Sequence, residues 1–199
     1  MKKAFTTAEL LIAMTIIGVI AVLVVPPLIR DYTAKVQTSA IKNFYTDLVS
    51  AIEKACSDNN VSELSETKYI ISGNEAEFLD KYFRGQEKNT FNSSYKSLSG
   101  DEDDFDAGDN YITIKNGSSI SMSCDGSSCT FYIDTNGTNS PNTGGLDMFK
   151  IIINGDNTVA SKSAKYTSGV IKNIPCNESA LGENCVYELI NNDWDMNKY

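Results

Sequence analysis

The chain begins, from residue 1 to residue 30, with MKKAFTTAELLIAMTIIGVIAVLVVPPLIR. Two lysines open this stretch, Arg30 closes it, and Glu9 is the only ionisable side chain between them. A run of about 20 apolar residues, rising about 1.5 Å per residue, matches the roughly 30 Å hydrocarbon thickness of a bilayer. A carboxylate at the front of such a helix is costly unless another group compensates it. The stretch therefore predicts a membrane-spanning helix with an unusual acidic residue at its start.

Two common kinds of N-terminal segment, a secretory signal peptide and a plain membrane anchor, are alternatives for this stretch. A secretory signal peptide has an apolar core of about 7–15 residues and a small-x-small cleavage site. Here the apolar run is longer and ends in Val24-Val25-Pro26-Pro27-Leu28, without Ala-x-Ala. A plain membrane anchor is the simpler alternative, with Glu9 lying at the level of the lipid headgroups.

A third interpretation comes from the residues around Glu9. The sequence Lys3-Ala4-Phe5-Thr6-Thr7-Ala8-Glu9-Leu10, followed by an apolar helix, resembles the cleavage and methylation site of type IV pilins and type II secretion pseudopilins. The family usually has Gly at the position of Ala4 and commonly an apolar residue at that of Thr7. The resemblance extends over residues 1–30 and implies that a membrane prepilin peptidase cuts between Ala4 and Phe5. It also implies methylation of the new Phe5 amine.

Glu9 matches the family's glutamate, and its charge indicates a role in assembly. Cleavage after Ala4 would create a cationic amine at Phe5, and in a bundle of staggered helices Glu9 of one subunit would meet the amine of its neighbour. A buried charge that loses its partner costs several kcal/mol, so this pairing would set the axial step between subunits. The resemblance also implies other pilin-like subunits, a polytopic platform protein and a cytoplasmic motor ATPase as partners.

Composition restricts the compartment and the partners. The chain has 199 residues, a net charge of −9 and a pI near 4.5, so binding of nucleic acid is not indicated. Lys2 and Lys3 precede the span, and the positive-inside rule keeps them cytoplasmic. We therefore expect a single-pass protein of the inner (cytoplasmic) membrane with an extracytoplasmic head, which later enters a filament.

Five cysteines fit an oxidising compartment, and an odd number cannot all pair within one chain. Cys124 and Cys129 flank a turn-like linker and lie on the same face of two alternating segments, so a hairpin would bring them together. A short polar loop separates Cys176 from Cys185. We expect those two local disulfides and a free or buried Cys56. A zinc site is weakly supported because the chain has no CxxC and no histidine.

Periodicity predicts an α+β fold with a long N-terminal helix packed on an antiparallel sheet, and the resemblance implies that this fold is pilin-like. The helix runs from about Phe5 to Cys56 as one rod; two helices broken at Pro26-Pro27 are the alternative. Strands are expected at 111–115, 120–124, 129–133, 148–153 and 158–161, with a hairpin turn at Asn154-Gly155. The expected organisation is a leader at 1–4, a transmembrane half-helix at 5–30, an amphipathic half-helix at 31–58 and a globular head at 59–199.

The loop from Asp134 to Asp147 is rich in oxygen-bearing side chains. Asp134, Asn136 and Asp147 could hold calcium, which takes 6–8 oxygen ligands. Gly137 and Gly145 occupy the fourth and twelfth positions, so the loop is not an EF-hand. Asx turns explain the same residues without a metal, and that is the interpretation the sequence favours. No other cofactor is indicated.

Catalysis is not expected from this composition. The absence of histidine excludes the usual Ser-His and Cys-His arrangements, and neither a P-loop nor GxGxxG occurs. Asn-x-Ser/Thr triplets, among them those that begin at Asn92, Asn116, Asn136 and Asn177, fit a glycosylation pattern that has little meaning in a bacterial context.

The sequence thus predicts a non-enzymatic filament subunit, of a type IV pilus or a type II secretion pseudopilus. The alternative is a membrane-anchored extracytoplasmic binding protein that does not polymerise.

Overall fold

The structure is a computed structural model that describes residues 6–83, 94–97, 102–104, 111–114, 116–137, 139–160, 164–167, 170–173, 176 and 185–195. Ala4 and Phe5, between which the prepilin cut is expected, lie outside the described residues. The chain forms two compact units, Met1–Val36 and Gln37–Tyr199, and each is described by itself.

The first element is the helix α1, which runs from Thr7 to Asp58 and contains both Pro26 and Pro27. The expectation of one helix over this range is therefore confirmed, and the alternative of two helices broken at the prolines is wrong. Asn60 adopts a left-handed backbone with φ 53°, and the Val61 N–H donates to the Cys56 carbonyl at 3.0 Å. This arrangement caps the carboxyl end of the helix and stops it.

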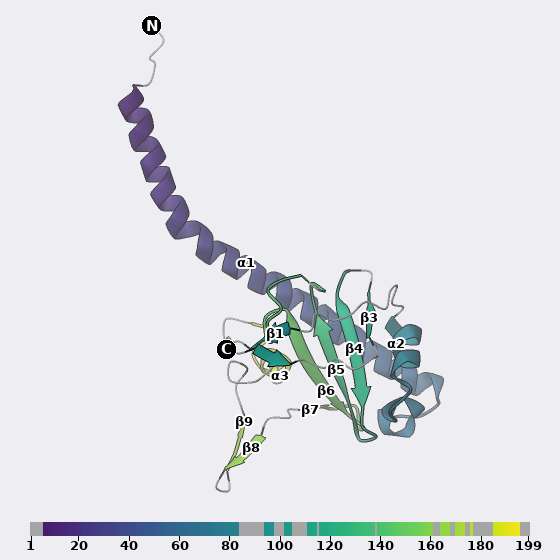
Figure 1. Ribbon diagram of the computed structural model, residues 1–199. Coiled ribbons are helices and arrows are strands. Elements are labelled where there is room, and N and C mark those ends of the chain that lie inside the picture. Colours follow the sequence, from purple (N-terminus) through teal and green to yellow (C-terminus); the bar gives the residue numbers. More distant parts are fainter. Residues whose placement is uncertain are drawn as a thin grey trace. The chain divides into compact units, whose positions relative to one another are not determined.

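In the second unit α1 presents an apolar face at helical spacing. Its fully or almost fully buried side chains recur every three or four residues, and they are Ile41, Phe44, Leu48, Ala51, Ile52 and Ala55. Such a stripe has to cover another apolar surface. Figure 1 shows this half of α1 lying alongside a β-sheet.

That sheet is a five-stranded antiparallel meander whose strand order follows the sequence. Its strands are β3 (Tyr111–Thr113), β4 (Ser119–Cys124), β5 (Ser128–Asp134), β6 (Met148–Asn154) and β7 (Val159–Ala160). Short loops join β3 to β4, β4 to β5 and β6 to β7, whereas residues 135–147 form a longer connection from β5 to β6. The α+β class and the antiparallel sheet are confirmed.

The strand register gathers the apolar side chains on one face of the sheet. Ile120 lies opposite Ile133, Met122 opposite Phe131, and Phe131 opposite Ile151. The helix α2 (Glu75–Phe83) covers part of this face, because the rings of Phe78 and Phe131 lie 6.0 Å apart. The ring of Phe83 in turn stacks on Phe44 of α1 at 5.7 Å. The two helices and the sheet thus share one aromatic core.

The remaining elements are short. They are the 3₁₀ turns η1 (Leu64–Glu66) and η2 (Lys68–Ile70), the strand pair β1 (Ser94–Lys96) and β2 (Glu102–Asp104), the pair β8 (Ala164–Thr167) and β9 (Val170–Asn173), and the helix α3 (Cys185–Asn191). After α3 the ring of Trp194 packs on Tyr45 of α1 at 5.6 Å, which attaches the residues that follow α3 to the long helix.

The β6–β7 hairpin differs in detail from the Asn154-Gly155 turn that was expected. The left-handed residue is Asn157, with φ 64°, and the Asn154 N–H donates to the Thr158 carbonyl at 2.9 Å. The side chain of Asn157 accepts from the Leu64 N–H at 2.8 Å and donates to the Ser62 carbonyl at 3.0 Å. Asn157 therefore ties the segment after α1 to the hairpin.

Asn157→Ala should lower the free energy of unfolding by about 2 kcal/mol, because it removes two hydrogen bonds and leaves an alanine in the left-handed region. Asn157→Gly is the matched control: it loses the same hydrogen bonds but tolerates the backbone, so its cost should be about half. Denaturant unfolding of the full chain in detergent measures both. If both variants lost the same free energy of unfolding, the left-handed backbone at residue 157 would make no contribution to the loss.

Candidate functional site

Glu9 lies in the first turn of α1, where its carboxylate accepts hydrogen bonds from the residue before the helix. The Thr6 backbone N–H and the Thr6 hydroxyl both donate to Glu9 Oε2, each at 2.8 Å. The Glu9 N–H donates back to Thr6 Oγ1 at 3.3 Å. This reciprocal pair is a capping box, which satisfies donors that the start of a helix otherwise leaves open.

The sequence analysis missed this local partner of Glu9, although Thr-x-x-Glu before an apolar run is its signature. Thr6 follows the expected cleavage point, so the cap would remain in a processed chain. Hydrogen bonds from neutral groups lower the cost of placing the carboxylate near lipid, but they do not cancel its charge. Glu9 therefore combines a structural contact within its own helix with a net negative charge.

The apolar part of α1 after Glu9 is exposed along its whole length. Side chains from Leu10 to Ile29 are about half exposed or more, reaching 73% at Val22. Among the described residues α1 is the helix that is long and apolar enough to cross a membrane. An exposed apolar surface of this size requires lipid or other protein around it.

A second candidate is the loop between β5 and β6, where the structure brings Asp134, Asn136 and Asp147 together. Asp134 is fully buried; its Oδ1 accepts from the Asn136 N–H at 3.1 Å and its Oδ2 from the Tyr95 hydroxyl at 2.6 Å. Tyr95 comes from β1, a contact that no local pattern in the sequence could reveal. This hydrogen bond thus attaches the loop to a strand that lies 39 residues earlier in the sequence.

Asp147 organises the other end of the same loop. Its Oδ1 accepts from the Thr143 N–H at 2.6 Å, and its Oδ2 accepts from the Asn142 N–H at 2.8 Å and the Asn136 amide at 3.3 Å. The bond from the Asn136 N–H to Asp134 is an Asx turn, as expected, whereas Asp147 accepts from residues that precede it in the chain. Every carboxylate oxygen of Asp134 and Asp147 has a donor from the protein. Within the described part of the chain, no group of three or more His, Cys, Asp or Glu is arranged to hold a metal.

The two carboxyl groups of this loop are electrostatically unusual. Burial raises the pKa of Asp134 to about 7. The nearby charge of Asp147 also raises this pKa, whereas the hydrogen bonds from Tyr95 and Asn136 lower it. Burial also raises the pKa of Asp147, although backbone N–H groups of Thr143 and Asn142 oppose it. A fully buried carboxylate pair is costly when both members are ionised.

The cysteines pair as the spacing predicted. Cys124 bonds to Cys129 across the β4–β5 hairpin, and Cys176 bonds to Cys185. Cys56 is free and buried, and burial raises the pKa of its thiol. A buried thiol with a raised pKa is a poor nucleophile, so Cys56 serves packing.

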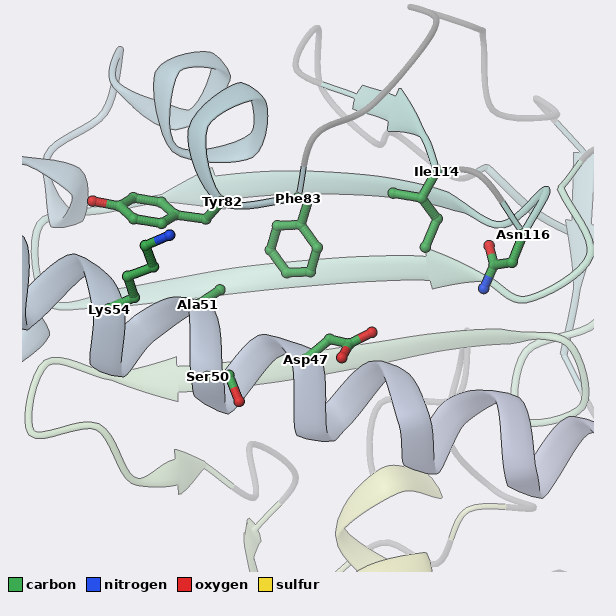
Figure 2. A pocket seen from close by; sticks show the side chains of 8 residues that line it. All are labelled: Asp47, Ser50, Ala51, Lys54, Tyr82, Phe83, Ile114 and Asn116. Atoms are coloured by element: carbon green, nitrogen blue, oxygen red, sulfur yellow. The ribbon is translucent and has the colours of Figure 1, made fainter.

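Figure 2 shows a groove of about 470 Å³ in the second unit, between α1, the end of α2 and the β3–β4 connection. It is lined by Asp47, Ser50, Ala51, Lys54, Tyr82, Phe83, Ile114 and Asn116. Its polar groups are one carboxylate, one ammonium, a hydroxyl, an amide and the phenol of Tyr82. Tyr82 donates to Asp58 at 3.1 Å, and burial raises the pKa of Tyr82 to about 12. The phenol thus remains protonated and offers no general base.

Comparison of the chain with protein-family models, with curated proteins and with solved structures finds no match.

Proposed function

We propose that this protein is a membrane-inserted precursor that a prepilin peptidase processes into the subunit of a type IV pilus-like or type II secretion pseudopilus filament. The observation that carries the proposal is the single acidic residue at the start of an otherwise uncharged, exposed helical span. The span holds the precursor in the inner membrane and later packs against other spans in the filament. The α+β head faces outward, and its role is structural rather than catalytic.

Assembly follows from the charge of Glu9. Cleavage between Ala4 and Phe5 exposes an ammonium group close to the membrane surface, and the same group on a staggered neighbour lies within reach of Glu9. Both charges lose water when the helices pack together, so each needs the other. A prepilin peptidase and methyltransferase, copies of this chain, related subunits, a platform protein and a motor ATPase are the partners that this function requires.

A second candidate function is a membrane-anchored extracytoplasmic binding protein that stays monomeric. Two observations favour it: the Thr6 cap gives Glu9 a partner without any neighbouring chain, and the groove in Figure 2 offers a polar and aromatic surface. In that case residues 1–4 would remain on the protein and α1 would serve as a tether.

The N-terminus of the protein extracted from membranes distinguishes the two functions. For a filament subunit we expect mass spectrometry to find a chain that starts at N-methylated Phe5, whereas an anchored binding protein would retain Met1. Ala4→Gly should be processed as well as the natural chain, because both residues are small. Ala4→Arg places a long cationic side chain at the cleavage point and should leave the precursor intact. Retention of residues 1–4 in the natural chain, in cells that process other prepilins, would refute the filament proposal.

A further inference from the structure

The second unit contains three Asn-Gly steps, at 116–117, 136–137 and 154–155. In an Asn-Gly step the glycine nitrogen can attack the side-chain amide of the asparagine, because glycine offers little steric resistance to closing the ring. We propose that Asn116 is a site of spontaneous deamidation that adds a carboxylate to the groove in Figure 2, while the fold protects Asn136 and Asn154. The inference holds whether or not the chain forms filaments.

The reaction needs no reactant other than water. The Gly117 nitrogen loses its proton and bonds to Cγ of Asn116, and the amide nitrogen of Asn116 leaves as ammonia. This gives a five-membered succinimide. Water then adds to one of the two succinimide carbonyls and breaks its bond to the ring nitrogen. The product is an aspartate or an isoaspartate at position 116, with one additional negative charge.

The geometry at Asn116 favours ring closure in three respects. The side chain is exposed, so it can turn towards the following nitrogen. The Ser118 N–H donates to Asn116 Oδ1 at 2.9 Å, and this oxygen gains negative charge when Cγ is attacked. No atom lies within 4 Å of the position that a Cβ would occupy at Gly117, so this side of the glycine is open, whereas its carbonyl oxygen faces Gly137. The Gly117 N–H bond to the Ile114 carbonyl, 2.9 Å long, must break first.

The Asn136-Gly137 step is held in a closed arrangement. The leaving nitrogen of Asn136 donates to the Ser140 carbonyl at 3.2 Å and to Asp147 Oδ2 at 3.3 Å. Its amide oxygen is buried without a hydrogen-bond partner, so no donor stabilises the charge that develops there. A Cβ at Gly137 would lie 2.7 Å from the Gly117 carbonyl oxygen, which shows how little space surrounds this backbone.

The Asn154-Gly155 step is also packed tightly. The Gly155 N–H donates to the Ser127 carbonyl at 2.9 Å, and the Asn154 amide donates to Thr158 Oγ1 at 3.0 Å. A Cβ at Gly155 would lie 2.9 Å from Cβ of Ser65. The Gly155 nitrogen is hydrogen-bonded just as the Gly117 nitrogen is, but the space beside Gly155 is filled, and this crowding opposes the backbone change that ring closure needs.

Deamidation at Asn116 changes the charge balance of the groove. Figure 2 shows Asn116 and Asp47 among the side chains that line it, together with the cationic Lys54. The unmodified groove has one carboxylate for one ammonium. After the reaction it has two carboxylates for the same ammonium, so it attracts cationic partners more strongly and repels anionic ones.

The test compares the three sites within one sample. The full-length protein is incubated in detergent at mildly alkaline pH and digested, and mass spectrometry that separates aspartate from isoaspartate follows each peptide. We expect Asn116 to lose its amide about tenfold faster than Asn136 or Asn154, since a donor on the developing oxyanion and an open backbone both lower its barrier. A rate at Asn136 or at Asn154 that equals or exceeds the rate at Asn116 would overturn the proposal.

Two controls attribute the difference to the fold. In concentrated urea, with the disulfides reduced, the three rates should converge, because the same Asn-Gly pair is then free at each site. Asn116→Gln should abolish the reaction at 116 under the same conditions, since glutamine has to close a larger ring, and should leave the two other sites unchanged. A tenfold preference for Asn116 that persisted in urea would mean that local sequence, not structure, selects it, and would also overturn the proposal.

Discussion

Glu9→Gln is expected to stop the chain from entering filaments while leaving it in the membrane. Glutamine retains an oxygen that can accept the Thr6 N–H, so the cap at the start of α1 persists. Only the charge is lost. A neighbour's Phe5 amine would then be buried without a counter-ion, at a cost of about 3 kcal/mol, or roughly a hundredfold in the assembly equilibrium. Immunoblots of the sheared-filament and membrane fractions measure both outcomes.

Thr6→Val is the matched control for this experiment. Valine has a similar size and keeps the backbone N–H but removes the hydroxyl, so the cap weakens by about 1 kcal/mol while the charge of Glu9 remains. We expect this variant to assemble with only a modest loss. If Thr6→Val were as defective as Glu9→Gln, the cap and not the charge would be the required feature. Normal assembly of Glu9→Gln would remove the proposed role of Glu9 in subunit register.

The free energy of unfolding should fall as the pH rises from about 4 to 7, and Asp134→Asn should remove most of that fall. Burial raises the pKa of Asp134 from 3.8 to about 7, so between these values the folded chain binds a proton that the unfolded chain has released. The contribution of Asp134 to the free energy of unfolding is therefore largest below about pH 4. By pH 7 the free energy of unfolding has fallen by up to about 4 kcal/mol because of this group. The raised pKa of Asp147 acts in the same direction.

Asparagine suits position 134 because its oxygen can accept from the Asn136 N–H while its amide donates to the Tyr95 hydroxyl. Denaturant unfolding of the full chain at several pH values, with and without added calcium, provides the measurement. The Asx-turn interpretation predicts that calcium leaves the natural chain's curve unchanged. A pH profile identical in the natural chain and in Asp134→Asn would contradict the proton linkage, and a calcium-dependent rise in stability would restore the metal interpretation of this loop.

The features predicted correctly from sequence are those that depend on neighbours along the chain. Helical spacing over Tyr32 to Ala55, alternation in β4 and β5, and a five-residue separation between Cys124 and Cys129 each reflect contacts within one element or one hairpin. Local geometry alone determines such contacts, because the period of a helix or strand fixes which side chains share a face. The Thr6–Glu9 cap belongs to the same class, and it was missed although its pattern is local.

Tertiary packing decided what the sequence left open. Tyr95 reaches Asp134 across a sequence separation of 39, and Asn157 reaches Ser62 across one of 95, distances over which a residue pattern carries no information. The three Asn-Gly steps are equivalent dipeptides in sequence, but a Cβ would meet Ser65 at Gly155 and the Gly117 carbonyl at Gly137, whereas it would meet nothing within 4 Å at Gly117. The sequence by itself determined the long apolar helix, the meander and the local disulfides. Only the fold decided which carboxyl groups are buried and which backbone is free to react, because burial and crowding come from segments that are remote along the chain.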